Sequence, residues 1–193
     1  MNEPNIFFHH NDINVSAIHP IRALKTYGPL EESYSKVNGV QKINLAVISP
    51  DFGYHKVITH LNNLTVAINH KSERDYLVEY PGFDKVYKRH LEIPKGTDSS
   101  YSYIIKSEDV SNLDTIQFYD YLKSCIDRVV VSQTDIDCLI IYIPEQWKRF
   151  RELKSEDVYF DLHDSIKIYC VKKGIKIQFI EQKSIGYYDQ AKI

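Results

Sequence analysis

The chain has 193 residues, of which 43% are hydrophobic and 26% are charged, and its formal net charge is -2. These values are typical of one globular domain with a single substantial core, or of one domain plus an appendage. The nearly balanced charge does not indicate a nucleic-acid-binding protein, because a strongly basic composition is absent. A local basic patch could still bind phosphate.

The cysteine content and the hydropathy of the sequence indicate the cellular compartment. Three cysteines without C-x-x-C spacing predict small buried hydrophobic side chains in a reducing compartment, and neither a disulfide nor a zinc framework. No apolar stretch approaches the length needed to cross a bilayer. We therefore expect a cytoplasmic protein without a membrane partner.

Residues 1–37 have loop character and are predicted to be an N-terminal extension without a core of its own. The adjacent pair His9 and His10 has no acidic or cysteine partner at metal-ligand spacing, which favours a solvated pair. Residues 38–193 are predicted to form the domain itself.

Within that domain, segments of strand type alternate with segments of helix type. Apolar runs predict strands, periodic spacing of apolar residues predicts helices, and Gly174 is placed to end the last helix. The predicted strands are 43–50, 101–105, 138–144 and a run from Ile175, and the predicted helices are 55–68, 115–129 and 162–173. This order predicts an α/β fold, a doubly wound Rossmann-like sandwich with a mainly parallel sheet and an N-terminal extension.

The last helix and strand carry a candidate anion site. His163 and Lys167 are four residues apart on one flank of the helix, which Asp161 can cap, and Gln178 lies near the exit of the following strand. The start of the helix is expected at the carboxyl edge of the sheet, where ligands of open α/β sheets bind. A helix N-terminus, a cation, an imidazole and an amide would suit a terminal phosphate there. Taken alone, each of these residues favours a structural role, and only their expected convergence indicates a site.

The connection after strand 138–144 places aromatic residues among cations, in "QWKRFRELK". Trp147 and Phe150 could stack on nucleic-acid bases while Lys148 and Arg151 contact the backbone. Alternatively, the segment is an exposed basic turn that Trp147 anchors in the core. The sequence leaves both interpretations open.

At this point a family resemblance becomes specific. The run "LIIYIPEQWKRFRELKSEDVYFDLHDSIKIYCVKKGIKIQFIEQKSI", followed by "AKI", resembles the MID domain of a short prokaryotic Argonaute. "HPIRALKTYGPL" followed by "INLAVISP" is similar to the segment that leads into that domain. The resemblance implies a Rossmann-like sandwich that holds the 5′-phosphorylated end of a guide strand and performs no catalysis itself.

The resemblance also implies individual site residues. His163, Lys167 and Gln178 match the first three positions of the family's phosphate pocket in order and approximate spacing, and Lys192 is the candidate for the fourth. By the same resemblance, Phe179 and the loop with Trp147, Lys148 and Arg151 would contact the first guide base and its backbone.

The implied partners are a guide of RNA or DNA and its complementary target strand. A PIWI domain is expected in cis or as a separate chain, since the resemblance stops near the start of that domain. PIWI can contribute a Mg²⁺ ion at the 5′-phosphate. Short Argonautes also act with a separate effector protein of TIR, sirtuin-like or nuclease type.

Two alternatives come from the residues. Asp161 and "EQK", Glu181 to Lys183, resemble the D…E-x-K pattern of metal-dependent nucleases, whose chemistry needs two carboxylates on one Mg²⁺ and a lysine near the attacking water. This signal is short, and Asp161 is expected at a helix start. A flavodoxin-like small-molecule site would need a glycine-rich loop, whereas "SPDFGYHK" has a single glycine.

Overall fold

The computed structural model describes residues 6–10, 13–17, 20–27, 42–68, 79–154 and 159–185. The chain divides into two compact units: residues 1–43, 61–92 and 193 form the first unit, and residues 44–60 and 93–192 form the second unit. The domain boundary predicted between residues 37 and 38 lies outside the described residues. Each unit is considered by itself.

The first unit contains regular structure where a loop-like extension was predicted. Strands β1 (Ile6–His10) and β2 (Ile13–Ala17) form an antiparallel pair, and helix α1 (Pro20–Tyr27) follows. Helix α1 packs on helix α4 (Phe83–Tyr87), which precedes strand β4 (His90–Glu92). The prediction of loop character was therefore wrong for these segments. The side chains of the His9–His10 pair lie outside the described part of the chain.

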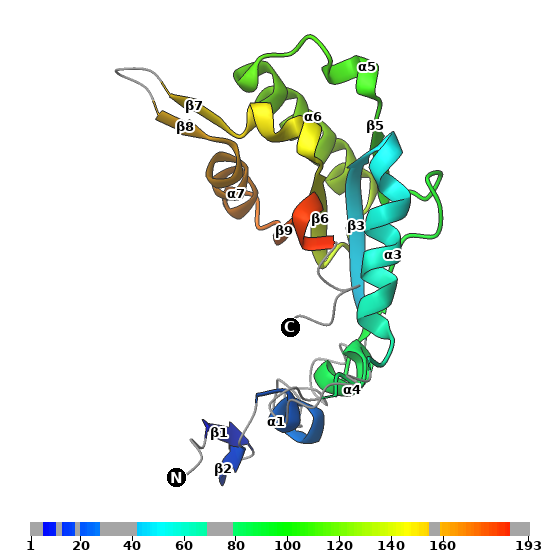
Figure 1. Cartoon of the computed structure of the whole chain (residues 1–193), viewed down its shortest axis with the longest axis vertical. Helices are drawn as coiled ribbons and strands as arrows, with labels where there is room; N and C mark the ends of the chain where they lie inside the picture. The colour runs from blue at the N-terminus through cyan, green and yellow to red at the C-terminus, as the bar shows by residue number, and fades with distance from the viewer. Residues whose placement is uncertain are drawn as a thin grey trace. The chain divides into compact units, whose positions relative to one another are not determined.

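The second unit is built on parallel strands, in agreement with the predicted α/β class (Figure 1). The strands are β3 (Lys42–Pro50), β5 (Ser102–Ile105), β6 (Cys138–Ile143) and β9 (Ile177–Glu181). They lie in the order β5-β3-β6-β9, and every pairing between them is parallel. The apolar runs of β3 and β6 are buried on both faces, as expected for interior strands of such a sheet.

Helices cover both faces of this sheet. Helices α6 (Thr115–Ser132) and α7 (Leu162–Lys172) share a core with Ile48 and Ile141 on one face. Tyr142 points to the opposite face, where Gly53, directly before α3 (Tyr54–Thr65), lies so near that a Cβ placed on it would be 2.7 Å from Tyr142 Cδ1. The short elements of this unit are η1 (Asp51–Gly53), α5 (Ser107–Val110), η2 (Glu145–Phe150), β7 (Glu152–Lys154), β8 (Tyr159–Asp161) and α8 (Gln182–Ile185).

Side-chain caps fix where the two long helices of the second unit begin. The Asp114 carboxylate accepts a hydrogen bond from Gln117 N at 2.8 Å, and the Gln117 side chain accepts one from Asp114 N at 3.0 Å, which is a capping box at the start of α6. Asp161 Oδ1 accepts from Asp164 N at 2.8 Å and caps α7 as predicted. Gly174 follows α7 with a φ of +71°, a conformation that favours glycine.

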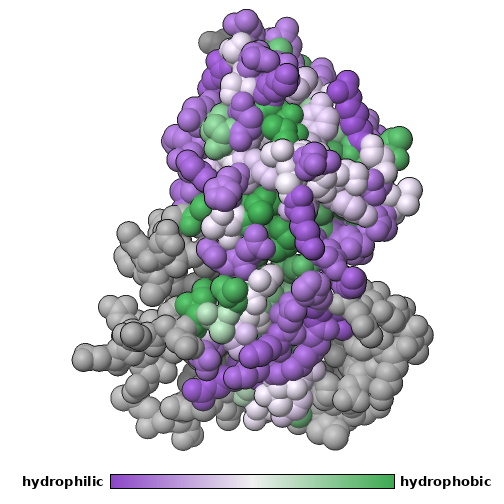
Figure 2. Space-filling model, turned by 90° about the vertical axis from the view of Figure 1, so that its right-hand side faces the viewer, coloured by the Kyte–Doolittle hydropathy of each residue, from purple (hydrophilic) through white to green (hydrophobic). Residues whose placement is uncertain are grey.

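The face of the molecule shown in Figure 2 is largely polar. Hydrophilic residues cover most of the coloured area in Figure 2, and hydrophobic residues appear there as separate small areas. No helix among the described residues is both long and apolar enough to cross a membrane. Cys125 and Cys170 are buried, Cys138 is partly buried, and all three are free thiols.

Candidate functional site

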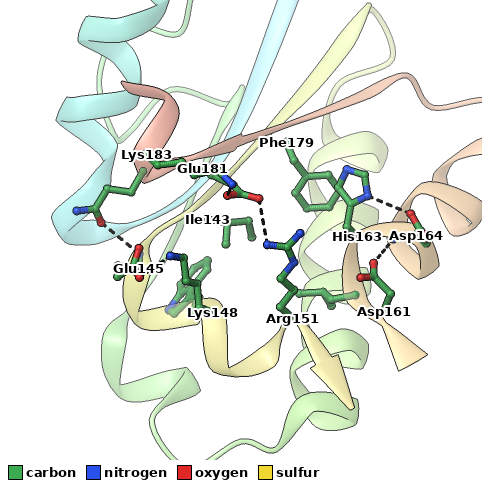
Figure 3. Close-up of a pocket in the computed structure, with 13 residues that line it drawn as sticks. Ile143, Glu145, Lys148, Arg151, Asp161, His163, Asp164, Phe179, Glu181 and Lys183 are labelled. Carbon is green, nitrogen blue, oxygen red and sulfur yellow. Dashed lines mark hydrogen bonds and ion pairs between the residues drawn. The ribbon is translucent and has the colours of Figure 1, made fainter. Parts of the chain in front are cut away.

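The candidate site is a cavity of about 240 Å³ in the second unit, at the carboxyl edge of the parallel sheet (Figure 3). This is the edge at which open α/β sheets bind ligands. The ends of β6 and β9, the 3-10 helix η2, the start of α7 and the start of α8 surround it. The lining residues are Ile143, Glu145, Trp147, Lys148, Arg151, Asp161, Leu162, His163, Asp164, Phe179, Glu181, Gln182 and Lys183.

The 3-10 helix η2 holds its side of the cavity through buried aromatic side chains. The Phe150 ring stacks on the Phe118 ring of α6 with centroids 4.1 Å apart, and Trp147 packs edge-on against Phe118 at 5.2 Å. Trp147 and Phe150 are only 3% and 2% exposed. Of the two interpretations open from the sequence, the buried anchor is the one observed, although Trp147 also lines the cavity.

The start of α7 contributes His163 to the cavity, as its position in the sequence suggested. The His163 ring lies against the Phe179 ring of β9 with centroids 4.8 Å apart. His163 Nδ1 is 3.1 Å from Asp164 Oδ1. The imidazole is therefore oriented from two sides, by an aromatic ring and by a carboxylate.

Each cation of the cavity faces a carboxylate. Lys148 Nζ is 2.5 Å from Glu145 Oε1, within η2. Arg151 Nη1 is 3.8 Å from Glu181 Oε1, and Lys183 Nζ is 2.8 Å from Glu181 Oε2. The close contact with the Lys183 ammonium outweighs partial burial and lowers the pKa of Glu181 below its ordinary value, so this carboxylate is ionised at neutral pH. The lining as a whole carries three permanent cations and four carboxylates in addition to His163.

The predicted convergence of His163, Lys167 and Gln178 is not seen. Lys167 does not line the cavity and makes no hydrogen bond or ion pair with a described residue. Gln178 pairs in register with Ile140 and so points to the sheet face opposite Phe179, where its Nε2 donates to Phe179 O at 2.8 Å. Lys192 lies outside the described residues.

Residues that sequence reasoning missed take part in the site. Gln182 Oε1 accepts a hydrogen bond from Glu145 N at 3.1 Å and so ties the end of β9 to η2. Asp164 and Glu145 line the cavity too. The available signal was their position, because Glu145 and Gln182 each come within two residues of the end of a strand whose carboxyl end reaches the ligand-binding edge.

One group of potential metal ligands lies in the cavity wall. One ligand atom each from Asp161, His163 and Asp164 lies within 4.8 Å of the others. Mg²⁺ prefers oxygen ligands alone, and Asp161 Oδ1 already accepts the capping hydrogen bond. This mixed group therefore does not fit the Mg²⁺ ion that the family resemblance implies.

Comparison with protein-family models and with curated proteins found no match for this chain.

Proposed function

We propose that the second unit is a nucleic-acid-binding module that anchors the 5′-phosphorylated end of a guide strand in an Argonaute-type system. The observation that carries the proposal is the cavity at the carboxyl edge of the sheet, where Lys148, Arg151 and Lys183 line one space. A phosphate group binds where cations converge in a concave site, and here it would replace carboxylates that already pair with those cations.

The remaining lining supports a nucleotide over a free anion. Phe179 and the His163 imidazole offer ring surfaces beside the cations, and nucleic-acid bases stack on such surfaces. The N-terminal end of α7, with its partial positive charge, borders the same space.

The proposal includes the partners that the family resemblance implies. The guide is RNA or DNA and pairs with a complementary target strand, in the cytoplasm. A PIWI domain in cis or on a separate chain completes the binding site, and a separate effector protein of TIR, sirtuin-like or nuclease type acts once the target is bound. The chain itself serves as a binding module without catalysis.

The direct test compares matched oligonucleotides. A 5′-phosphorylated strand and its 5′-hydroxyl twin, each as RNA and as DNA, are titrated with the protein at fixed ionic strength and followed by fluorescence anisotropy. The salt must be fixed because phosphate contacts are strongly screened. We expect tighter binding of the 5′-phosphorylated strand. Equal affinity for both twins in both chemistries would overturn the proposal.

A metal-dependent nuclease is the second candidate, since Asp161, Glu181 and Lys183 line the same cavity. Two carboxylates and a lysine in one space are the minimum for that chemistry. Against it, Glu181 already pairs with Lys183, and Asp161 caps α7. Incubation of a labelled strand with the protein and Mg²⁺ or Mn²⁺ decides: metal-dependent cleavage that Glu181→Gln abolishes supports a nuclease, and an intact strand excludes it under those conditions.

A further inference from the structure

Ion pairs in the second unit form a continuous chain that reaches the cavity through Arg151, Glu181 and Lys183. Lys154 pairs with Glu152 at 2.5 Å, Glu152 lies 4.0 Å from Arg151, Arg151 lies 3.8 Å from Glu181, and Glu181 pairs with Lys183 at 2.8 Å. The chain thus alternates three cations with two carboxylates. It carries one positive charge in excess, whereas the separate pair of Lys148 and Glu145 is balanced.

Glu181 lies between Arg151 and Lys183 in this chain of ion pairs. Its two oxygens face two different cations, with Oε1 toward Arg151 and Oε2 toward Lys183. Oε2 is almost fully shielded from solvent. The carboxylate thus places a negative charge between the two cations, 3.8 Å from Arg151 Nη1 and 2.8 Å from Lys183 Nζ, where one end of a phosphate group would lie.

From this arrangement we propose that Arg151 and Lys183 are the cation pair that holds the anionic ligand, and that the Glu181 carboxylate occupies the ligand's place and competes with it. The inference rests on the proposed function for the identity of the ligand as a terminal phosphate. It assigns the binding to residues outside the pattern that the family resemblance implies, namely His163, Lys167 and Gln178.

Competition between Glu181 and the anion predicts which substitutions strengthen anion binding and which weaken it. When the anion binds, Glu181 turns away and Arg151 and Lys183 exchange one negative partner for another, so only the difference between the two interactions favours binding. Neutralising Glu181 removes the competitor and strengthens anion binding. Neutralising Arg151 or Lys183 removes a cation that binds the anion and so weakens anion binding.

The test uses inorganic phosphate as the probe and Trp147 as the reporter. Trp147 is the only tryptophan of the chain and lines the cavity, so its emission reports on occupancy. Phosphate is titrated at constant ionic strength and pH into the wild-type chain and into Glu181→Gln, Arg151→Gln and Lys183→Gln. Glu152→Gln is the matched control, because it removes a carboxylate next to Arg151 without touching the cavity lining.

We expect Glu181→Gln to bind phosphate about two- to fivefold more tightly, the size associated with one partly exposed ion pair. Arg151→Gln and Lys183→Gln should weaken binding, and Glu152→Gln should change it less than Glu181→Gln does, because the Glu152 carboxylate lies outside the cavity lining. Unchanged or weaker binding by Glu181→Gln, or no response to phosphate in any of the proteins, overturns the inference. If Glu181→Gln does not fold, Glu181→Met, which is neutral and of similar length, takes its place.

The two proposals fail separately. A wild type that prefers the 5′-phosphorylated strand while Glu181→Gln binds phosphate no better refutes only the role of Glu181. A Glu181→Gln variant that gains phosphate affinity while no protein distinguishes the oligonucleotide twins refutes only guide binding.

Discussion

The ring of Phe150 lies parallel to the ring of Phe118, with an interplanar angle of 6° and centroids 4.1 Å apart. Phe118 belongs to α6 and Phe150 ends η2, so this stack joins the segment that carries Lys148 and Arg151 to the main core. Lys148 and Arg151 therefore lie on a segment that aromatic packing fixes to the core.

Removing one ring of this stack should destabilise the second unit. Phe150→Ala deletes a fully buried aromatic side chain, which typically costs about 3–5 kcal/mol. Urea unfolding followed by circular dichroism measures the loss. Val131→Ala, at a position that is 82% exposed, is the matched control and should stay within about 0.5 kcal/mol of the wild type. A Phe150→Ala protein as stable as this control would contradict the stack's structural role.

A second prediction concerns the contact between α3 and the sheet. A Cβ at Gly53 would lie 2.7 Å from Tyr142 Cδ1 and 3.1 Å from Pro50 Cγ. Because Tyr142 is 1% exposed and packed in the core, Gly53→Ala should destabilise the protein by about 1–3 kcal/mol through overpacking. Thermal or urea unfolding provides the measurement.

Gly174→Ala tests the effect of backbone conformation alone, because an added Cβ there would make no close contact. A Cβ there meets nothing within 4 Å, but its φ of +71° is unfavourable for alanine by about 1 kcal/mol. We expect a loss at Gly53 that comes from steric contact alone, since its φ is not positive. If Gly53→Ala proved neutral, the close approach of α3 to Tyr142 would be wrong.

The parts of the fold that could be predicted from sequence are those in which local pattern and burial agree. The runs of β3 and β6 are apolar throughout because both faces of these strands are covered, and α6 shows helical spacing because one stripe packs on the sheet. The hairpin β7–β8 was missed. Glu152, Leu153 and Lys154 are all exposed, so no apolar alternation marks their strand.

The candidate site was predictable in location but only partly in composition. The position of His163 follows from the Asp161 cap and from the edge at which α7 begins. Lys167 lies about 6 Å further along the helix axis, at a rise of about 1.5 Å per residue, which takes it away from that edge. Successive residues of a strand point to opposite faces of the sheet. Gln178 therefore points away from the face that carries Phe179, which keeps its side chain out of the cavity. The pairing of Glu181 with Arg151 depends on tertiary contact and has no local signal.

The outer surfaces of α6 and α7 are joined by a carboxylate with a predictable pH response. Asp127 accepts hydrogen bonds from Tyr169 Oη at 2.6 Å and from Lys173 Nζ at 2.6 Å. Partial burial raises the pKa of Asp127, but the hydrogen bonds from Lys173 and Tyr169 outweigh it and hold the pKa below the ordinary value.

Because this pKa is lowered on folding, the carboxylate stabilises the protein above its unfolded-state pKa, near 4, and the contribution disappears as the pH falls through the folded-state value. Asp127→Asn should therefore be less stable than the wild type at pH 7, with a smaller difference at pH 3. Urea unfolding at both pH values measures this. A difference that stays constant across the range would contradict the pairing.

Tyr169→Phe tests the same junction at fixed pH. The substitution removes only the hydroxyl group that donates to Asp127, and we expect a loss of about 1 kcal/mol, the usual net value of such a hydrogen bond. The double variant Tyr169→Phe/Asp127→Asn completes a double-mutant cycle. If the two single effects simply add, the two groups are not coupled, which would contradict their contact.

The resemblance and the structure make opposite predictions for Lys167. The family pattern makes this lysine a phosphate ligand, whereas the structure places it outside the cavity that Arg151 lines. We expect Lys167→Ala to keep the preference for a 5′-phosphorylated strand and Arg151→Gln to lose it. Anisotropy titrations with the two oligonucleotide twins provide the comparison. Loss of the preference in Lys167→Ala alone would restore the family pattern and remove Arg151 from the site.

Asp161 offers a test that separates its two candidate roles. Its carboxylate caps α7, and the nuclease alternative also assigns it to a metal ion. Asparagine caps a helix about as well as aspartate but carries no charge, so Asp161→Asn should keep most of the stability. Asp161→Ala should lose about 1 kcal/mol, measured by urea unfolding without metal. Addition of Mn²⁺ then discriminates the roles. A metal-dependent increase in stability in the wild type that Asp161→Asn lacks would establish a metal site, whereas equal unfolding of both proteins with and without Mn²⁺ leaves Asp161 as a cap alone.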